Sequence, residues 1–284
     1  MLLKSNKITA IIGVKNEARR LPYIFENLKD FSEIIVFDGG SEDETEKVCK
    51  DYDIKFIKRP HTLRNIVGGD LQFMFSYVKT LYVLNVNCSH YYPKKLLKEF
   101  QRIANEGIYH SVYHDYLIYT YGKVVHRPFI RRRSSGTNFY RVDSVNFSNS
   151  IVHNEAPVEL PENLIWYVPA TDEYSVQLLR DYDVRKAELN HSFYSDLDSK
   201  LRYDNGKRTN IFFILWKPLK TFGNQYIRCG SILYGIEGFI YSLIYAQLEL
   251  NIQLKIWEIQ NNFSIEKIKN ENLRKRKLFI ENNY

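Results

Sequence analysis

The sequence predicts an α/β fold, with a mixed sheet flanked by helices and a helical C-terminal region. A short, continuously apolar stretch at 8–14 is typical of a buried parallel strand, and the stretches at 33–38 and 54–58 are predicted as a second and a third strand. Polar and helix-like stretches separate them, which is the pattern of βαβ units. From about residue 171 the pattern becomes helical and turn signals are few. A chain of 284 residues that is 44% hydrophobic can fill the core of such a fold.

The predicted elements follow one another regularly along the first half of the chain. After the first strand, helices are expected at about 19–29, 41–52, 67–79 and 93–105, with a further strand at 80–87. The stretch 109–133 is aromatic and β-branched, which predicts an antiparallel excursion and therefore a mixed sheet. We expect three regions, an α/β core over 1–170, a helical region over 171–260 and a basic tail over 261–284.

The charge of the chain narrows the choice of partners. Forty Lys and Arg against 33 Asp and Glu give a net charge of +7, which favours phosphorylated ligands, nucleic acid or anionic lipid surfaces. No nucleic-acid-binding motif is recognised, so we expect no nucleic acid partner. Three separate cysteines without a CxxC pair and an N-terminus without a signal-peptide pattern predict a cytoplasmic protein.

Polar residues follow three of the predicted strands, where ligands of open α/β sheets bind. These residues are Lys15, Asn16 and Glu17 after the first strand, Asp38, Gly39 and Ser41 after the second, and Asn87 and Ser89 after the strand at 80–87. The stretch "GVKNEARR" has one glycine, which argues against a dinucleotide fold. Asp38 can accept hydrogen bonds from a base or ribose, or it can cap the helix that follows. Gly39 lets a ligand approach the backbone.

The stretch "AIIGVKNEARRLPYIFENLKDFSEIIVFDGGSEDETEKVCKDY" resembles the opening of family 2 glycosyltransferases with a GT-A fold, in the branch of lipopolysaccharide-core and capsule transferases. The resemblance extends, less specifically, through "YGKVVHRPFIRRR", "IVHNEAPVEL", "LRYDNGKR" and "YGIEGFIYSL". It implies a nucleotide-diphosphate-sugar donor, inverting transfer, and a glycan or lipid-linked acceptor near a membrane. It also implies that Asn16, Glu17, Asp38 and Ser41 line the nucleoside, with Asp43 nearby.

The chain departs from this family where a D-x-D-[DE] motif is expected. Asn87 and Ser89 occupy the two Asp positions, and His90 follows them. Mg²⁺ and Mn²⁺ prefer carboxylate oxygens, so we assign no metal ligand here. Mn²⁺ or Mg²⁺ held through His153 or His90 stays an open alternative.

Without a metal, fixed cations must stabilise the departing diphosphate. Arg131 and Arg133, which share a strand face with Arg127, are the first candidates, and Lys15 and Arg19 are the second. The alternative is a basic edge strand that prevents sheet pairing. The H-x-E motif matches the family's His-Glu region and supplies His153 and Glu155. Glu155 is the expected general base, with Asp172 or Glu173 as the second choice. His153 and Glu155 could instead pair structurally with arginines.

The apolar segment 232–250 is interrupted by Glu237 and Glu249, which is unlike a spanning helix. We expect it either to lie on the inner-membrane surface, with the basic stretch 273–277 attracting anionic headgroups, or to pack on the core. The predicted function is transfer of a sugar in surface polysaccharide or lipopolysaccharide assembly. The alternative is a catalytically degenerate protein that binds a nucleotide-sugar or a partner.

Overall fold

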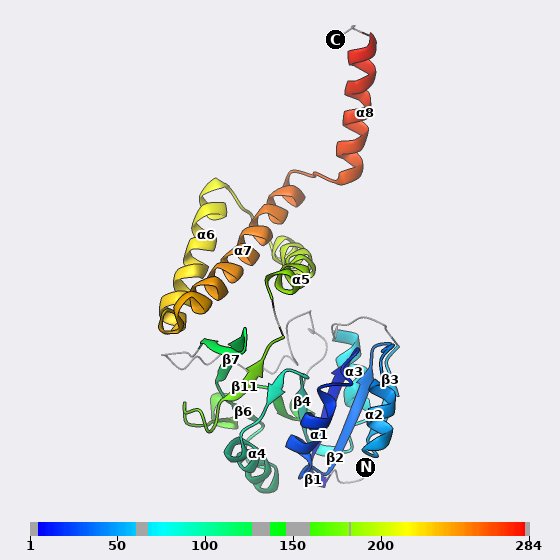
Figure 1. Ribbon diagram of the computed structural model, residues 1–284, viewed down its shortest axis with the longest axis vertical. Helices are drawn as coiled ribbons and strands as arrows, with labels where there is room; N and C mark the ends of the chain where they lie inside the picture. The colour runs from blue at the N-terminus through cyan, green and yellow to red at the C-terminus, as the bar shows by residue number, and fades with distance from the viewer. Residues whose placement is uncertain (1–4, 61–67, 127–136, 146–159, 182, 282–284) are drawn as a thin grey trace. The chain divides into compact units, whose positions relative to one another are not determined.

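The computed structural model describes residues 5–60, 68–126, 137–145, 160–181 and 183–281. The chain divides into two compact units, Met1–Asp181 and Tyr182–Tyr284, and each is described by itself. The first unit holds two β-sheets, and the second is helical (Figure 1).

The larger sheet of the first unit has seven strands in the order β10-β6-β9-β4-β1-β2-β3. Their bounds are β1 (Ser5–Val14), β2 (Glu33–Asp38), β3 (Lys55–Lys58), β4 (Thr80–Val86), β6 (Ser111–Tyr113), β9 (Phe139–Arg141) and β10 (Ile165–Tyr167). Strands β1 to β4 pair in parallel, whereas β9 runs antiparallel to both β4 and β6. This mixed sheet, flanked by helices, confirms the predicted fold class.

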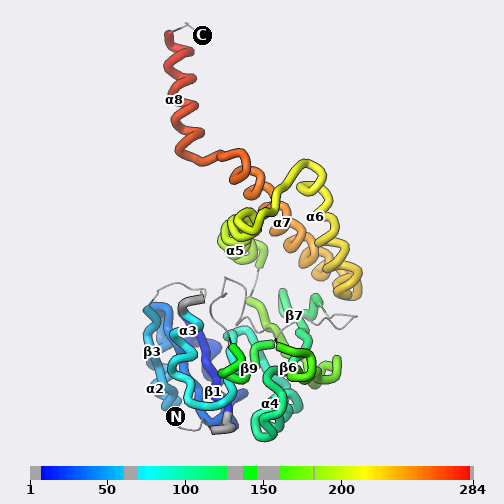
Figure 2. The backbone as a smooth tube through the Cα atoms, turned by 180° about the vertical axis from the view of Figure 1, so that it is seen from behind, coloured from blue at the N-terminus to red at the C-terminus, as the bar shows by residue number. Residues whose placement is uncertain are grey.

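Helices cover both faces of this sheet (Figure 2). They are α1 (Leu21–Leu28), α2 (Thr45–Asp51), α3 (Gly68–Ser76) and α4 (Lys94–Glu106). Side chains of α1, α2 and α4 pack on one face, and those of α3 pack on the other. Because strand side chains alternate, Ile12 of β1 joins the first cluster and Ile11 joins the second. Burial on both faces explains why the inner strands β1 and β4 are largely apolar, whereas β3 at the edge of the sheet is partly exposed and carries Lys55 and Lys58.

A smaller sheet has the order β5-β11-β7-β8. Its strands are β5 (His90–Tyr91), β7 (Tyr116–Thr120), β8 (Lys123–His126) and β11 (Val176–Leu179), and two short 3₁₀ turns, η1 (Val142–Ser144) and η3 (Glu162–Leu164), lie elsewhere in the unit. The expectation that helical structure begins at about 171 is wrong for β11. This segment pairs in parallel with β7 and antiparallel with β5, so distant strands determine its conformation.

The second unit contains the remaining helices: α5 (Val184–Asp204), α6 (Ile211–Gly223), α7 (Gly235–Gln260) and α8 (Ile265–Glu281), with a π-helical turn η4 (Asn224–Arg228) and a 3₁₀ turn η5 (Ser231–Tyr234). Asp183 and Asn210 cap α5 and α6 by accepting hydrogen bonds from backbone amides of the first turns. The stretch predicted as a basic tail forms α8, in which no residue is buried.

Polar contacts fix α7 against its neighbours. Arg202 of α5 pairs with Glu249 of α7 at 2.8 Å, and the Thr209 hydroxyl donates to Gln253 of α7 at 2.8 Å. Gly238 lies directly against η5, because a Cβ there would stand 2.0 Å from the carbonyl oxygen of Ser231. The helix 235–260 therefore packs against other parts of the helical unit on at least two of its sides.

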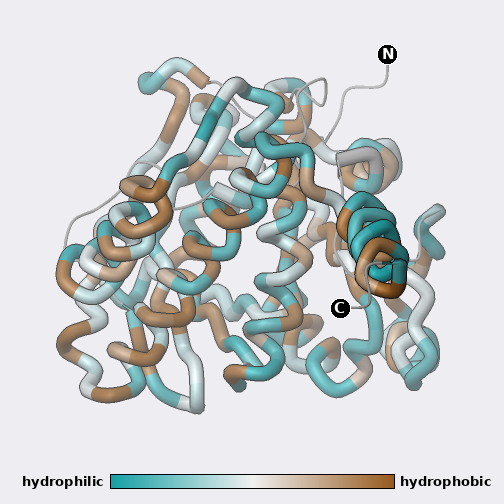
Figure 3. Tube along the Cα trace, turned by 90° about the horizontal axis from the view of Figure 1, so that it is seen from above, coloured by the Kyte–Doolittle hydropathy of each residue, from teal (hydrophilic) through white to brown (hydrophobic). Residues whose placement is uncertain are grey.

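No single helix within the described ranges is long and apolar enough to cross a membrane. One pair of segments, Ile211–Arg228 and Ser231–Gln260, has together the length and composition of a broken span, with a bend of 70° between them. Figure 3 shows hydrophobic and hydrophilic residues alternating along the helices, including the one that ends at the C-terminus.

Candidate functional site

The ends of β1, β2 and β4 meet at one edge of the larger sheet. The pairing register places Val14 opposite Asp38 and Ile12 opposite Val86, so these parallel strands end within two residues of one another. The loops that follow carry all the described residues predicted for the ligand site. We call this edge the carboxyl edge.

Hydrogen bonds join the loops after β1 and β2 to each other. The Asn16 amide donates to the Ser41 hydroxyl at 2.8 Å, and the Glu42 amide donates to the Asn16 side-chain oxygen at 2.8 Å. Asn16 has a φ of 58°, in the left-handed region that Asn tolerates better than most residues. The two loops therefore form one connected platform.

The same platform continues into α2. The amides of Glu17 and Ala18 donate to the side chains of Thr45 and Asp43, at 3.0 and 3.1 Å. Burial acts in the opposite direction, but hydrogen bonds from Thr45 and from the Ala18 amide lower the pKa of Asp43. Sequence reasoning named Asp43 only as a neighbour of the site and did not find Thr45. The signal was available, since both follow the second strand.

Asp38 holds its own loop in place. Its side chain is buried, and its carboxylate accepts from the Gly40 amide at 2.9 Å and from the Ser41 amide and hydroxyl at 3.1 and 2.5 Å. Gly40 has a φ of 85°, which glycine adopts without strain. These contacts hold the loop itself, and they are not the helix cap considered for Asp38, because Glu44 occupies the N-cap position of α2.

The side chain of Glu17 points toward Arg20, while its backbone amide contacts Thr45. The two side chains form a two-pronged ion pair, with nitrogen to oxygen distances of 2.6 and 2.5 Å, and Arg20 also reaches Asp181 at 3.4 Å. Burial alone would lower the pKa of Arg20, but the hydrogen bond and charge of Glu17 raise it. Burial, together with Glu17, raises the pKa of Cys88, so Cys88 remains a neutral thiol.

In the loop after β4, Asn87 forms a turn. Its side-chain oxygen accepts from the Ser89 amide at 3.0 Å and from the Ser89 hydroxyl at 2.9 Å. Asn87 is exposed and Ser89 is half-buried. The Ser89 carbonyl accepts from the Leu179 amide at 2.7 Å, which ties this loop to β11. Asn87 and Ser89 thus hold each other at the carboxyl edge.

A polar cluster beneath this loop was not found from the sequence. His90 points to Tyr92 and Asn138, with its Nδ1 3.1 Å from the Tyr92 hydroxyl and 3.4 Å from the Asn138 side-chain nitrogen. The Asn138 side-chain oxygen lies 2.8 Å from Nε2 of His114. Burial lowers the pKa of His90 to about 3 and also lowers the pKa of His114. Both rings are therefore neutral at pH 7 and support the loop from below.

The described residues of the carboxyl edge do not fit a Mg²⁺ or Mn²⁺ ion. The Asn87 oxygen already accepts two hydrogen bonds, Ser89 is neutral, and His90 faces the polar cluster. No group of three or more His, Cys, Asp or Glu within the described part of the chain could hold a metal. His153, the other histidine considered as a ligand, lies outside the described residues. Arg131, Arg133 and Glu155 lie outside them too.

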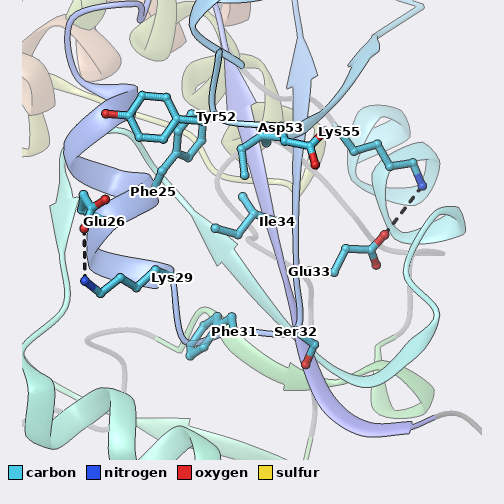
Figure 4. Close-up of a pocket in the computed structure, with 11 residues that line it drawn as sticks. Phe25, Glu26, Lys29, Phe31, Ser32, Glu33, Ile34, Tyr52, Asp53 and Lys55 are labelled. Atoms are coloured by element: carbon cyan, nitrogen blue, oxygen red, sulfur yellow. Dashed lines mark hydrogen bonds and ion pairs between the residues drawn. The ribbon is translucent and has the colours of Figure 1, made fainter. Parts of the chain in front are cut away.

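A second candidate, a pocket of about 390 Å³, lies at the opposite edge of the sheet (Figure 4). It is lined by the second half of α1, by the residues that follow α1 and α2, and by the first residues of β2 and β3. Four of the charged groups on its rim form two ion pairs, Lys29 with Glu26 at 3.3 Å and Lys55 with Glu33 at 3.8 Å. Because parallel sheets bind ligands beyond the carboxyl ends of their strands, we do not assign a function to this pocket.

A family model for glycosyl transferase family 2 matches residues 9–155, which is more than half of the chain. The chain therefore belongs to glycosyl transferase family 2, and it is a glycosyltransferase enzyme. It is 26% identical over 262 residues to an uncharacterized glycosyltransferase of Rickettsia bellii, an alignment that covers 86% of this chain and 84% of that protein.

Two solved structures are also similar to the chain. Residues 1–349 of S. aureus TarS, in complex with UDP-GlcNAc, share 14% identity and a TM-score of 0.47, with coverage of 91% of this chain and 93% of that one. Glucosyl-3-phosphoglycerate synthase from Mycobacterium tuberculosis, in complex with Mn²⁺, uridine diphosphate and phosphoglyceric acid, shares 15% identity and a TM-score of 0.36. That likeness covers 49% of this chain and 57% of that one.

Proposed function

We propose that this glycosyltransferase moves a sugar from a nucleotide-diphosphate-sugar donor to a glycan or lipid-linked acceptor, with inversion, in surface polysaccharide or lipopolysaccharide assembly. The observation that carries the donor half is the platform formed by the loops after β1 and β2 at the carboxyl edge. Ligands of α/β sheets bind there. The UDP-GlcNAc complex of TarS supports a nucleotide-sugar as the donor.

In the proposed reaction, an acceptor hydroxyl oxygen attacks the anomeric carbon of the sugar. The bond between that carbon and the diphosphate oxygen breaks, and the nucleoside diphosphate leaves with the bonding electrons. Glu155 takes the hydroxyl proton, with His153 beside it, and Arg131 and Arg133 stabilise the charge that grows on the diphosphate. Lys15, Asn16, Glu17 and Ser41 line the donor, and Asp38 and Gly39 shape the loop that approaches it.

Asn87 and Ser89 act in this scheme as hydrogen-bonding groups for the donor. Because both are neutral and already hold each other, they order the third loop without an ion. Glu155→Gln should lower turnover by about a hundredfold, the scale of general-base catalysis, with donor affinity nearly unchanged. Single-turnover kinetics and calorimetry with the same donor separate the two effects.

A donor screen tests the proposal. UDP-, GDP- and dTDP-sugars are incubated with the protein in Mn²⁺ and again in chelator, and release of nucleoside diphosphate is measured. We expect turnover with at least one donor class in chelator. Donor binding without turnover under any condition would support the degenerate binding protein. Strict dependence of wild-type donor binding on Mn²⁺ would contradict the proposed cation mechanism.

A double variant then asks whether a metal site can be restored. Asn87→Asp with Ser89→Asp places two carboxylates at the third loop, where they would face the diphosphate without an ion between them. We expect lower turnover in chelator, with partial recovery in Mn²⁺. Ser32→Asp with Asn105→Asp, both exposed and away from the carboxyl edge, adds the same charge and serves as the control. Equal loss in both variants would show a general effect of charge.

A further inference from the structure

Helix α6 exposes a continuous apolar stripe. Ile211, Phe212, Leu215, Trp216 and Leu219 are all exposed, and the spacing of three and four residues places them on one side of the helix. No residue of α6 is buried. The side chain of Leu215 is 62% exposed and that of Trp216 is 51% exposed. The Phe212 and Trp216 rings stack on each other at 6.3 Å. Such a stripe on a protein surface indicates an interaction site.

The turn between α6 and α7 continues this exposure. Ile227 at the end of η4, Ile232 and Leu233 in η5, and Ile236 at the start of α7 are exposed. Gly230 and Gly235, both with positive φ, allow the chain to reverse here, and Gly238 brings α7 close to η5. We call the stripe and this turn together the apolar hairpin.

The apolar segment that follows in α7 is less available. Its residues Tyr241, Ser242 and Gln253 are buried, and the side chain of Glu249 is paired with Arg202 of α5. Of the larger apolar residues of α7, Tyr241, Ile252 and Ile256 are buried, whereas Phe239, Leu243, Leu254 and Trp257 are exposed, so packing explains part of its apolar sequence. In α6 no burial explains it, so the exposed surface differs from the one that the sequence indicated.

Positive charge predominates along the apolar hairpin, although Asp204 and Glu237 flank it in the sequence. Residues 205–236 contain Lys207, Arg208, Lys217, Lys220 and Arg228, and they contain no Asp or Glu. The basic residues of α8, by contrast, share their helix with Glu266, Glu271 and Glu281, and several are paired, as Arg274 is with Glu271 at 2.8 Å. The apolar hairpin thus combines exposed aliphatic and aromatic groups with a local excess of positive charge.

We propose that the apolar hairpin is the surface that docks on an anionic phospholipid bilayer. Aliphatic side chains with a Trp on one face, and Lys and Arg along the border, match the interface between headgroups and acyl chains. A second copy of the chain fits less well, because a symmetric contact brings each patch against itself and would oppose equal positive charges. The proposal rests on the part of the proposed function that concerns a lipid-linked acceptor, and it assigns membrane binding to a defined surface of the protein.

Docking on the bilayer, and not spanning of it, follows from the contacts of α7. The second part of the bent pair carries the ion pair of Glu249 and the buried amide of Gln253, both of which face protein groups of the same unit. An interfacial helix leaves these contacts intact. The protein should therefore leave vesicles when salt screens the charges.

Co-sedimentation of the full chain with vesicles tests the proposal, without any sugar donor. The vesicles contain either phosphatidylcholine alone or phosphatidylcholine with 30% phosphatidylglycerol, and binding is measured at low salt and in 1 M NaCl. Leu215→Glu should weaken binding to anionic vesicles by at least about tenfold, since it removes buried apolar area and adds a repelled charge. Its matched control is Ile108→Glu in the first unit, where the wild-type side chain is 61% exposed.

Lys220→Gln with Arg228→Gln should weaken the same binding by roughly 25-fold, about fivefold for each charge. Lys50→Gln with Lys98→Gln removes the same charge from exposed positions of the first unit and should change it little. Circular dichroism confirms that each variant is folded.

Four results would overturn the proposal: equal pelleting of Leu215→Glu and wild type, no binding of wild type to anionic vesicles, retention on vesicles in 1 M NaCl and alkaline carbonate, or a wild-type dimer that Leu215→Glu dissociates. Donor turnover, measured on the same preparations without vesicles, reports on the proposed function separately. A chain that binds vesicles but turns over no donor would leave the docking surface standing and remove the proposed reaction.

Discussion

Substitution of Asn16 tests the connection between the first two loops of the carboxyl edge. Asn16 makes two separable contributions: its side-chain oxygen accepts from the Glu42 amide at 2.8 Å, and its backbone adopts a φ of 58°. Asn16→Asp keeps both, Asn16→Gly keeps only the backbone conformation, and Asn16→Ala keeps neither. The series therefore measures each contribution by difference.

The expected magnitudes follow from these contacts. Loss of the hydrogen bond should cost about 1 kcal/mol of unfolding free energy in Asn16→Gly. Asn16→Ala should cost about 2 kcal/mol, because the left-handed conformation adds about 1 kcal/mol for a residue with a Cβ and no local hydrogen bond. Asn16→Asp should remain close to wild type. The site is exposed, so water replaces part of the lost bond and these values are upper estimates.

Urea unfolding with and without UDP, or the donor class found in the screen, measures both stability and binding. A shift of the midpoint at constant slope reports the free energy. Ligand stabilisation should shrink in the order Asp, Gly, Ala, because a looser platform must be ordered on binding. Equal destabilisation in Asn16→Gly and Asn16→Ala would refute the reasoning from φ. An Asn16→Asp variant as unstable as Asn16→Ala would refute the reasoning from the hydrogen bond.

Three further predictions concern other parts of the chain. Asp38→Ala should lower the unfolding free energy by about 3 kcal/mol, since it removes hydrogen bonds from two amides and a hydroxyl to a buried carboxylate. Asp38→Asn should cost less, and urea unfolding that shows no change in stability for either variant would contradict this. His90 has a folded pKa of about 3, below its ordinary value of 6.5, so the unfolded chain binds a proton that the folded chain excludes. The unfolding free energy should thus fall as pH drops from 6.5 toward 3, by at most about 1.4 kcal/mol per pH unit, and His90→Gln should flatten this slope between pH 7.5 and 5. Gly238→Ala should lower the thermal midpoint of the helical unit by several degrees, because its Cβ would stand 2.0 Å from the Ser231 carbonyl oxygen; an unchanged midpoint would show that η5 moves freely.

Periodicity was sufficient to predict the elements whose own residues carry a strong apolar pattern. The strands at 33–38 and 80–86 and the helix at 94–106 are found within a few residues of where alternation and apolar spacing predicted them. Strand β11 was not predictable in this way, because its four residues become a strand only by pairing with β5 and β7, far away in the sequence. Helix α8 was hidden by its composition, since pairs such as Arg274 with Glu271 support it without any buried face.

The candidate site shows a similar division. Topology alone predicts which residues reach the carboxyl edge, because parallel strands end together. The contacts that each side chain makes depend on atoms the sequence does not place: Asp38 faces its own loop, Glu17 faces Arg20, and His90 faces inward. The roles assigned to Arg131, Arg133, His153 and Glu155 stay predictions.

The bond from the Leu179 amide to the Ser89 carbonyl has a consequence for the order in which the chain folds. The platform of the first two loops needs only residues up to about 60, which belong to neighbouring βαβ units and can form while the ribosome is still translating. The loop at 87–90 must wait for Asn138 and then for β11, about ninety residues later. Long-range pairing of this kind is slow, because the intervening loop must close first. We therefore expect a nascent chain that already recognises a nucleotide well before it can position a sugar.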